Sequence, residues 1–195
     1  MTSTEPEGWK IALKPRRSDL MTDALAYLMH SKADSNLGER KDRLIHEHIH
    51  DPYKTPHKLR KPSVCPECGA VFVDGRWQWS ACAPSGAHRE ICQACHRIRD
   101  KYPAGVVTLS GGFVSEHKEE LLHLARNNES QEKQAHPLHR IMDIEERADS
   151  IVIATTDIHL PRQIGEALCR AYKGHLDLRY DYEGYFVRAE WRREA

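Results

Sequence analysis

Two cysteine pairs, Cys65-Pro66-Glu67-Cys68 and Cys92-Gln93-Ala94-Cys95, are separated by 23 residues and decide how the middle of this chain folds. Two residues between cysteines is the spacing that lets both thiolates of a pair reach one metal ion. Two such pairs supply the four sulfur ligands of a tetrahedral zinc ion. Gly69 follows the first pair, at a position where a zinc knuckle often needs a positive φ. The sequence therefore predicts one zinc site formed by Cys65, Cys68, Cys92 and Cys95.

Two other interpretations of these pairs stay open, namely two disulfides or redox-active CxxC pairs. A redox pair normally sits at the start of a helix after a strand, and a single pair is enough. A filled four-cysteine site leaves no position for water or substrate, so we expect a structural metal and not a catalytic one. Cys82, His88 and His96 lie close to the pairs along the chain and are alternative ligands.

Length and composition bound the class of protein. The 195 residues suffice for one ordinary domain or two small ones, and 39% hydrophobic with 30% charged residues is polar for a compact domain. No stretch approaches the roughly 18 apolar residues of a membrane-spanning helix, and the first residues form no apolar signal core. CxxC pairs without an export signal indicate a reducing compartment, so we expect a cytoplasmic protein without a membrane partner.

The charge of the chain is balanced, with 29 basic and 29 acidic residues. This balance counts against a generic nucleic-acid coat, which is usually strongly basic, but it is compatible with local basic patches. The 13 histidines are numerous. If several of them titrate, the chain becomes cationic as the pH falls below about 6.5.

Residues 1–61 are expected to form a flexible, basic and largely extended arm. Ser18 can cap a short helix that runs to about His30. The alternating histidines of Ile45–Asp51 resemble a metal site, but exposed histidines are the preferred interpretation. A basic run broken by prolines follows, consisting of Lys54, Lys58, Arg60 and Lys61. We expect this run to become ordered on a phosphate-bearing partner, the alternative being a solvated linker.

Residues 62–102 are expected to form a zinc ribbon, a small module of hairpins. Residues 70–73 predict a strand, Asp74-Gly75 a tight turn, and residues 76–79 the return strand. Trp77 and Trp79 share one face of that strand by its period of two. A small module needs such aromatics for its core, so a core role is preferred over base stacking or partner docking.

Residues 103–195 predict a separate α+β domain. Hydrophobic alternation and capping signals indicate the element order β-α-β-β-α-β-β. The strands are expected at 105–109, 140–146, 151–155, 176–182 and 185–191, and the helices at about 115–134 and 157–172. The first six elements match a ferredoxin-like arrangement, in which two helices cover one face of an antiparallel sheet. The last strand is expected to extend that sheet.

The last two strands offer a candidate nucleic-acid surface. Arg188 and Arg192 lie opposite the apolar face of the last strand, and Arg179 lies on the polar face of the preceding one. Arginines together with an aromatic such as Phe186 on an open sheet are how RNA-recognition sheets hold phosphates and bases. Acidic residues lie between these cations, so an ordinary solvated sheet face is the preferred interpretation and nucleic-acid binding is the alternative. The candidate nucleic-acid contacts are Lys54, Lys58, Arg60, Lys61, Arg76, Arg179, Phe186, Arg188 and Arg192.

Several short motifs follow one another in a definite order along the chain. They are Cys65-Pro66-Glu67-Cys68-Gly69, Gly75-Arg76-Trp77, Cys92-Gln93-Ala94-Cys95, Tyr102-Pro103-Ala104-Gly105 and Thr155-Thr156-Asp157-Ile158-His159-Leu160. This order resembles a small family of poorly characterised bacterial proteins. That family is in turn similar to the N-terminal part of the archaeal and eukaryotic ribosomal export adaptor of the nonsense-mediated-decay-3 type.

The adaptor carries CxxC zinc motifs followed by α/β segments, and it binds the large ribosomal subunit. The resemblance covers residues 62–193 and implies binding to ribosomes or structured RNA. It does not imply nuclear export, because the adaptor's additional CxxC pairs, its export-signal region and its further β domains have no counterpart in this sequence.

Familiar enzyme motifs are absent from the sequence. It contains no GxxxxGK(S/T) phosphate loop, no GxGxxG and no GxSxG elbow. Asp157 is expected to cap the last helix and not to act in catalysis. We therefore expect a non-enzymatic zinc-binding factor that associates with ribosomes or structured RNA. A zinc-ribbon module for protein interaction or regulation is the alternative, and a CxxC redox or metal-dependent enzyme ranks third.

Overall fold

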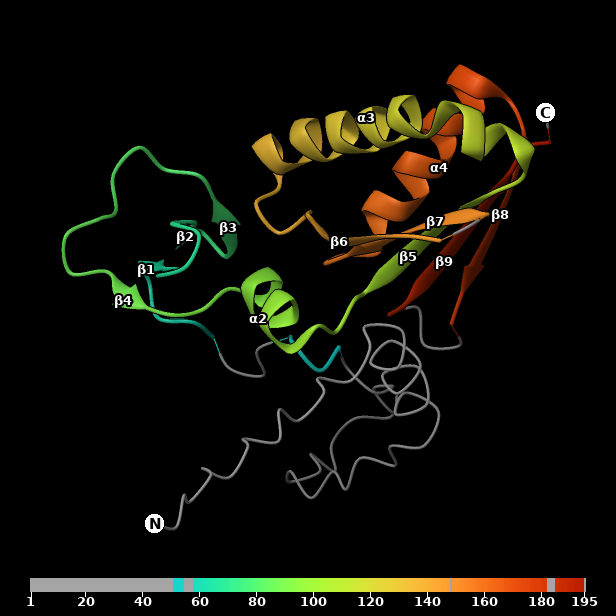
Figure 1. Ribbon diagram of the computed structural model, residues 1–195. Coiled ribbons are helices and arrows are strands. Elements are labelled where there is room, and N and C mark those ends of the chain that lie inside the picture. The colour runs from blue at the N-terminus through green and yellow to red at the C-terminus, as the bar shows by residue number, and fades with distance from the viewer. Residues whose placement is uncertain (1–50, 55–57, 148, 182–184, 195) are drawn as a thin grey trace, which may run out of the picture. The chain divides into compact units, whose positions relative to one another are not determined.

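The structure is a computed structural model that describes residues 51–54, 58–147, 149–181 and 185–194. The helix expected from Ser18 to His30 and the histidine-rich stretch 45–50 lie outside the described residues. The described residues belong to one compact unit. Within this unit, a metal module of residues 58–102 precedes an α+β part of residues 103–194 (Figure 1).

The described residues of the metal module form short strands and one helix: β1 (Ser63–Val64), β2 (Val71–Val73), β3 (Arg76–Gln78), β4 (His88–Arg89) and α2 (Gln93–Asp100). The strand order is β3-β2-β1-β4, with β1 antiparallel to β2 and parallel to β4. Asp74 and Gly75 join β2 to β3 with φ values of 54° and 85°, as a two-residue hairpin turn requires. This hairpin confirms the sequence prediction, whereas β1, β4 and α2 have no counterpart in it.

In its described residues the α+β part alternates strands with two long helices: β5 (Gly105–Ser110), α3 (Gly112–Ala135), β6 (Ile141–Glu146), β7 (Ser150–Thr155), α4 (His159–Tyr172), β8 (His175–Tyr180) and β9 (Val187–Arg192). The expected element order is confirmed. α3 begins at Gly112, before the predicted start at Ser115, and its backbone is non-helical at His117. None of the described helices is long and apolar enough to cross a membrane.

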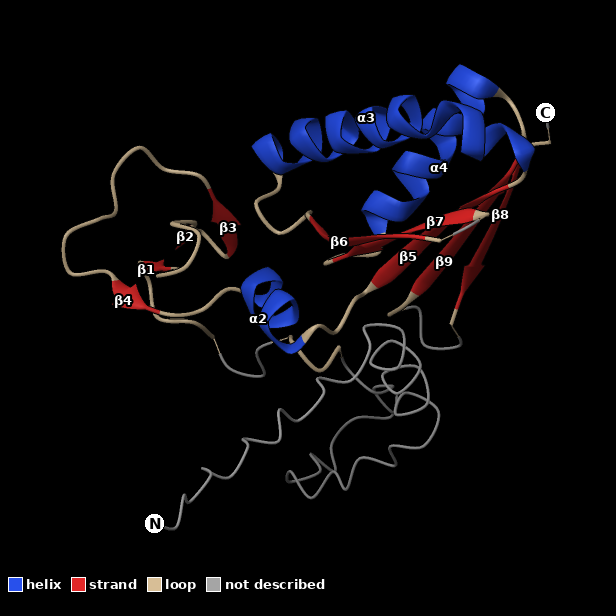
Figure 2. Ribbon diagram, viewed as in Figure 1, coloured by secondary structure: helices blue, strands red, loops and turns tan. Residues whose placement is uncertain are grey.

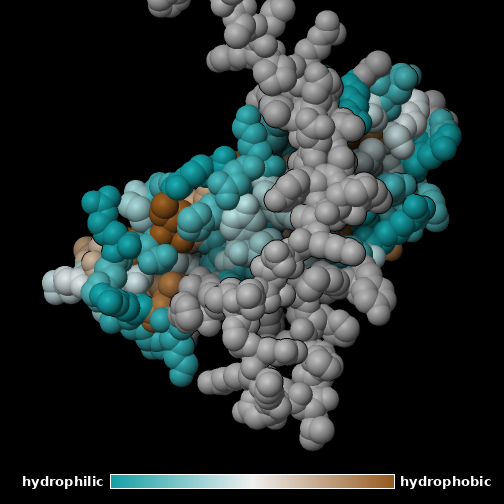
Figure 3. All heavy atoms as spheres, turned by 90° about the horizontal axis from the view of Figure 1, so that it is seen from below, coloured by the Kyte–Doolittle hydropathy of each residue, from teal (hydrophilic) through white to brown (hydrophobic). Residues whose placement is uncertain are grey.

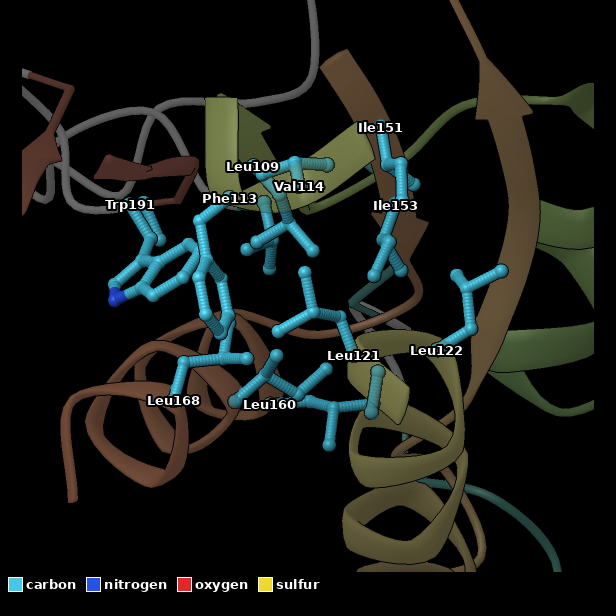
Figure 4. Close-up of a cluster of buried hydrophobic side chains, with 14 residues drawn as sticks. Leu109, Phe113, Val114, Leu121, Leu122, Ile151, Ile153, Leu160, Leu168 and Trp191 are labelled. Atoms are coloured by element: carbon cyan, nitrogen blue, oxygen red, sulfur yellow. The ribbon is translucent and has the colours of Figure 1, made fainter. Parts of the chain in front are cut away.

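Both long helices cover the same face of the sheet, so the α+β part has two layers (Figure 2). Alternate residues of the strands point toward the helices, and Leu109 of β5 and Trp191 of β9 are fully buried there. The helices contribute Phe113, Val114, Leu121, Leu122, Leu160, Ile164 and Leu168 to the same core (Figure 4). Seen from below, the visible described surface is mostly hydrophilic (Figure 3).

The last two strands lie in places that differ from the prediction. The sheet order is β6-β7-β5-β9-β8, and β9 runs parallel to β5. A ferredoxin-like sheet with an added edge strand would pair β5 with β8 and leave β9 outside. The structure has the reverse, because Val187, Ala189 and Trp191 of β9 are fully buried whereas every residue of β8 is half-buried or exposed. The fold is therefore α+β with mixed sheets, and the ferredoxin-like order is not confirmed.

Candidate metal centre

The first cysteine pair lies in a tight turn between β1 and β2. Cys65 directly follows β1, and Gly69 has the expected positive φ, 78°. Two backbone hydrogen bonds close the turn, from Cys65 N to the Ala70 carbonyl at 2.8 Å and from Gly69 N to the Cys65 carbonyl at 2.9 Å. The turn thus has the knuckle form that the CxxC spacing predicts.

The second cysteine pair stands at the start of α2. Cys92 precedes the helix and Cys95 lies in its first turn, where His96 N donates to the Cys92 carbonyl at 3.0 Å. The partial positive charge at a helix N-terminus stabilises anions, thiolates included. One side of the site is therefore a turn and the other is a helix, in place of the hairpin ribbon that the sequence predicts.

The four sulfur atoms form one compact group. All lie within 4.8 Å of one another, with Cys65 Sγ 3.8 Å from Cys95 Sγ and Cys68 Sγ 3.7 Å from Cys92 Sγ. A tetrahedral zinc ion with Zn–S bonds of about 2.3 Å holds its sulfurs about 3.8 Å apart. Cys68 is half-buried and the other three are buried. The donor set and its spacing fit a zinc ion.

The other interpretations of the cysteines fit this geometry less well. All described cysteines are free, and the close sulfur contacts cross between the two pairs. The second pair does stand at a helix start, as a redox pair would, so it is the cross-pair contacts that favour a shared ion. The group of potential ligands contains none of Cys82, His88 and His96, and Cys82 is exposed.

Hydrogen bonding and burial govern the charge on the sulfurs. The hydrogen bond with the Cys92 thiol lowers the pKa of Cys68 to about 4, and the Ala70 backbone and Arg140 add to this effect. The same bond, together with burial, raises the pKa of Cys92, and burial raises the pKa of Cys95 to about 12. Without a metal the thiols therefore share protons, and zinc binding would displace them.

A buried arginine from outside the metal module contacts the sulfurs. Arg140 precedes β6 and is 7% exposed. Its Nη1 lies 3.5 Å from Cys95 Sγ and its Nη2 lies 3.9 Å from Cys92 Sγ. Burial opposes its charge, but hydrogen bonds and attraction to the cysteine sulfurs outweigh burial and raise the pKa of Arg140. Sequence reasoning missed this residue, because no local pattern marks it as a partner of the cysteines.

A second buried arginine ties residues 51–54 to α2. Arg97 is 3% exposed, and its Nη2 donates to Asp51 Oδ1 at 2.6 Å. The Arg97 guanidinium lies 4.6 Å from the centre of the Tyr53 ring, and the Tyr53 hydroxyl donates to Asp100 Oδ2 at 2.9 Å. This described piece of the expected arm thus packs on the metal module, and sequence reasoning did not find that contact.

The core of the metal module is small and consists largely of the ligands themselves. It contains Cys65, Ala70, Trp77, Cys92, Ala94 and Cys95. Trp77 is 6% exposed, which confirms its core role, whereas Trp79 is 39% exposed because β3 ends at Gln78 and the strand alternation stops there. So few apolar residues give little folding free energy, and a bound metal ion would add to it.

Several predicted basic contacts are exposed beside β1 and β4. His88 N donates to the Pro62 carbonyl at 3.0 Å, which brings β4 alongside the basic run before β1. We call Lys58, Arg60, Lys61, His88 and Arg89 the basic edge. All five are exposed, and none has an ion-pair partner among the described residues. Sequence reasoning missed His88 and Arg89 as contacts, because β4 joins β1 only in the fold.

Two other predicted contacts of this region lie apart from the basic edge. Arg76 is exposed on β3, which is the opposite border of the same small sheet. Lys54 is exposed in the segment that packs on α2, and its backbone N donates to the Asp51 carbonyl at 2.8 Å. The structure therefore does not gather all the predicted basic residues into one patch.

Arginines of the last two strands share one face of the large sheet. Arg179 of β8 lies directly opposite Arg188 of β9, and both are exposed. Arg179 and Arg192 each form an ion pair with a nearby carboxylate, at 2.6 and 2.7 Å. Phe186 is 7% exposed, and the Arg188 guanidinium lies 4.8 Å from the centre of its ring. Phe186 thus supports Arg188 and is not the exposed stacking platform that the sequence predicts.

No known protein family, curated protein or solved structure matches this chain at a significant level. The resemblance to the ribosomal export adaptor therefore stands on the motifs quoted above. The geometry of the cysteine group and its surroundings has to support any functional proposal.

Histidines and carboxylates also gather between the end of α3 and the start of α4. His139 Nδ1 lies 3.3 Å from Glu132 Oε2, and His139 Nε2 lies 3.7 Å from Asp157 Oδ2. Asp157 Oδ2 accepts hydrogen bonds from the backbone N of His159 at 2.7 Å and of Leu160 at 3.0 Å, so Asp157 caps α4 as predicted. Apart from the cysteines, the described residues hold no group of three ligands close enough for one metal ion.

Proposed function

We propose that this protein is a non-enzymatic factor in which a structural zinc ion shapes a basic edge that binds structured RNA, with the ribosome as the leading target. The observation that carries the proposal is the basic edge, whose Lys and Arg side chains are exposed without an ion-pair partner in the described part of the chain. Such cations are available to phosphates, which dominate the affinity of proteins for nucleic acids.

The uneven distribution of charge supports the same surface. Residues 58–102 contain eight Lys and Arg against four Asp and Glu, while the whole chain contains 29 of each. Positive charge is thus concentrated in the metal module of a neutral protein. A local excess of this kind steers a polyanion to one face without making the whole protein a nucleic-acid coat.

Arg188, which lies opposite Arg179 in the sheet, offers a second anchor for phosphate. Like charges directly opposite each other on neighbouring strands are destabilising. Arg188 is held over Phe186 and has no carboxylate partner among the described residues. Asp177 already offsets the charge of Arg179, so a phosphate at this face would accept hydrogen bonds mainly from the Arg188 guanidinium.

Zinc has a structural role in this proposal. Four thiolates complete the tetrahedral coordination and leave no position for water or substrate, which supports a binding factor over a metal-dependent enzyme. The cysteine group joins the turn after β1 to the start of α2. A bound ion would therefore hold the strands that carry the basic edge.

The resemblance to the ribosomal export adaptor supports the ribosome as the target. Its quoted motifs include both cysteine pairs and Arg76, which belong to the metal module. What the resemblance contributes is limited to binding of ribosomes or structured RNA. It adds no enzymatic activity to the proposal.

Binding to a labelled RNA hairpin at several salt concentrations tests the proposal. We expect the zinc-loaded chain to bind with an affinity that falls steeply with salt, because phosphate contacts release counterions. Combined Lys58→Ala, Arg60→Ala and Arg89→Ala should reduce the slope of log affinity against log salt by about 2, since each phosphate contact contributes roughly 0.7 to 0.9.

A matched control removes three cations that are paired with carboxylates, by Lys118→Ala, Arg147→Ala and Arg162→Ala. Both triple variants change the net charge equally, so a non-specific charge effect would alter both slopes alike. The proposal fails if the control lowers the slope as much as the basic-edge variant does. It fails equally if the wild-type protein has no affinity for the hairpin.

Protein interaction is the second candidate, and large exposed apolar side chains favour it. Ile98 of α2 is 40% exposed and Trp79 is 39% exposed, both within the metal module. A protein that docks on these side chains would bind with weak salt dependence, since few charges would be involved. In a sucrose gradient of cell lysate, co-migration that survives ribonuclease and moderate salt would favour this candidate over RNA.

A further inference from the structure

The side chain of Arg140 is held by the α+β part and directed at the metal module. Its Nε donates to the Pro137 carbonyl at 2.6 Å, and its backbone N donates to Thr156 Oγ1 at 2.9 Å. Its two terminal nitrogens reach the sulfurs of Cys92 and Cys95 at 3.9 and 3.5 Å. Arg140 is therefore a fixed link between the start of β6 and the cysteine group.

The Arg140 guanidinium needs a negative partner because it is buried. Among the described residues, no carboxylate lies within ion-pair distance of it. A buried charge without a partner is strongly destabilising. Thiolates supply that partner. Four thiolates outnumber the positive charges of Zn²⁺, so the loaded centre stays anionic and attracts a cation.

We propose that Arg140 is the counter-charge of the zinc centre, and that zinc binding acts through Arg140 to fix the junction between the metal module and β6. This inference rests on the zinc centre of the proposed function and does not depend on RNA. Guanidinium groups suit the role because they are always charged and donate hydrogen bonds from a planar fork. Groups that hydrogen-bond to metal ligands orient those ligands and tune the affinity for the metal.

Further contacts connect Arg140 to the surrounding junction. Thr156 N donates to the Arg140 carbonyl at 2.9 Å, and Thr156 Oγ1 donates to the Leu138 carbonyl at 2.5 Å. Leu138 packs against the cysteine cluster. Trp79 Nε1 donates to the Lys133 carbonyl at 2.5 Å, and the Trp79 ring centre lies 5.8 Å from the Arg140 guanidinium. Loss of zinc would remove the ion that holds the sulfurs of Cys92 and Cys95 in place beside Arg140, and these contacts would loosen together.

The zinc affinity of Arg140→Met tests the first half of the proposal. In the full chain, competition with a chromophoric chelator should show zinc bound about 10- to 100-fold more weakly, the usual effect of removing a group that hydrogen-bonds to metal ligands. Arg140→Lys should recover part of the loss, because it restores the charge without the planar fork. This second variant keeps the test decisive if Arg140→Met does not fold.

Arg97→Met is the matched control. Arg97 is also a buried arginine of this region, 3% exposed, but its ion pair is with Asp51 and its other hydrogen bond is to the Tyr102 carbonyl. Its loss should destabilise the fold, and through the coupling of folding and metal binding it should weaken zinc binding less than Arg140→Met does. Equal weakening of zinc binding in both variants would overturn the proposal, as would unchanged affinity in Arg140→Met and Arg140→Lys.

Amide hydrogen exchange tests the second half. The backbone N–H groups of Arg140 and Thr156 join the start of β6 to the end of β7 beside the junction, and both should lose protection when a chelator removes zinc from the wild type. Zinc-loaded Arg140→Met should show the same loss, whereas Ile153 N–H within β7 should stay protected. If the amide exchange rates of Arg140 and Thr156 do not change when zinc is removed, the proposal is overturned. A wild-type chain without zinc affinity would overturn the metal assignment and this inference with it.

Discussion

At the scale of single residues, Gly111 stands where the chain meets its own C-terminal segment. It joins β5 to α3 with a φ of 103°, and a Cβ at this position would lie 2.1 Å from the Arg193 carbonyl oxygen. A side chain cannot occupy that space unless the backbone moves. A glycine is therefore required at this position, because two backbone segments approach each other closely here.

We expect Gly111→Ala to lower the free energy of unfolding by about 3 kcal/mol or more, because backbone strain and a steric clash add. Gly86→Ala is the control. Gly86 also has a positive φ, 75°, but nothing lies within 4 Å of its Cβ position. Its substitution should cost about 1 kcal/mol. Urea denaturation of the zinc-loaded proteins measures both values, and equal costs would mean that Arg193 moves away without penalty.

Two aromatic residues show that local periodicity does not always predict the exposure of a side chain. Trp77 and Trp79 alternate in sequence, but the strand that holds them ends between the two. Phe186 lies one residue before β9, and the Arg188 guanidinium covers its ring. In both cases the exposure of the ring depends on where a strand ends, and long-range strand pairing decides that point.

At the scale of elements, the start of α4 depends on one carboxylate. Asp157→Ala should lower the free energy of unfolding by about 1 kcal/mol, because the backbone N–H groups of His159 and Leu160 lose their acceptor. Asp157→Asn should keep most of the stability, since an amide oxygen also caps a helix. Denaturation of both variants distinguishes the two effects. A similar loss in both would show that the negative charge at the helix start matters more than the hydrogen bonds.

The early start of α3 has a cause far along the chain. The apolar period that begins at Leu121 predicts the regular part of the helix but not its first turn. Phe113 in that first turn is buried, with its ring centre 6.3 Å from that of Trp191 and 3.8 Å from the Arg193 guanidinium. Contacts with the C-terminal segment thus extend the helix beyond what its own periodicity indicates.

At the scale of the whole molecule, zinc should hold the metal module together while the α+β part keeps its own core. Cys68→Ser should lose zinc and unfold residues 58–102, because metal binding and folding are coupled in small zinc modules. The core around Leu121 and Trp191 contains no cysteine ligand, so the sheet and its helices should persist. Metal analysis together with hydrogen exchange across the chain measures both effects.

Cys82→Ser is the control for that experiment, since Cys82 is exposed and lies outside the sulfur group. It should keep the zinc content and the exchange pattern of the wild type. A zinc content that is unchanged in Cys68→Ser would contradict the four-cysteine site. Loss of zinc in Cys82→Ser would instead make Cys82 a ligand.

The sequence by itself determined the features whose causes are local. The spacing of the cysteines, the Asp74-Gly75 turn and the Asp157 cap each act within a few residues, and the structure has all three. The alternation of apolar residues likewise identified the strands and the two long helices of the α+β part, because the period of two or of 3.6 is a property of one element.

Only the tertiary structure decided the strand order and the charges around the cysteines. In the sheet, β9 lies between β5 and β8, because the helices bury the apolar face of β9. The fold buries the Arg140 guanidinium, and no carboxylate among the described residues pairs with it. The guanidinium instead contacts the sulfurs of Cys92 and Cys95, which can carry negative charge. Both outcomes depend on free energies of contact between segments far apart in the chain, and no local pattern contains that information.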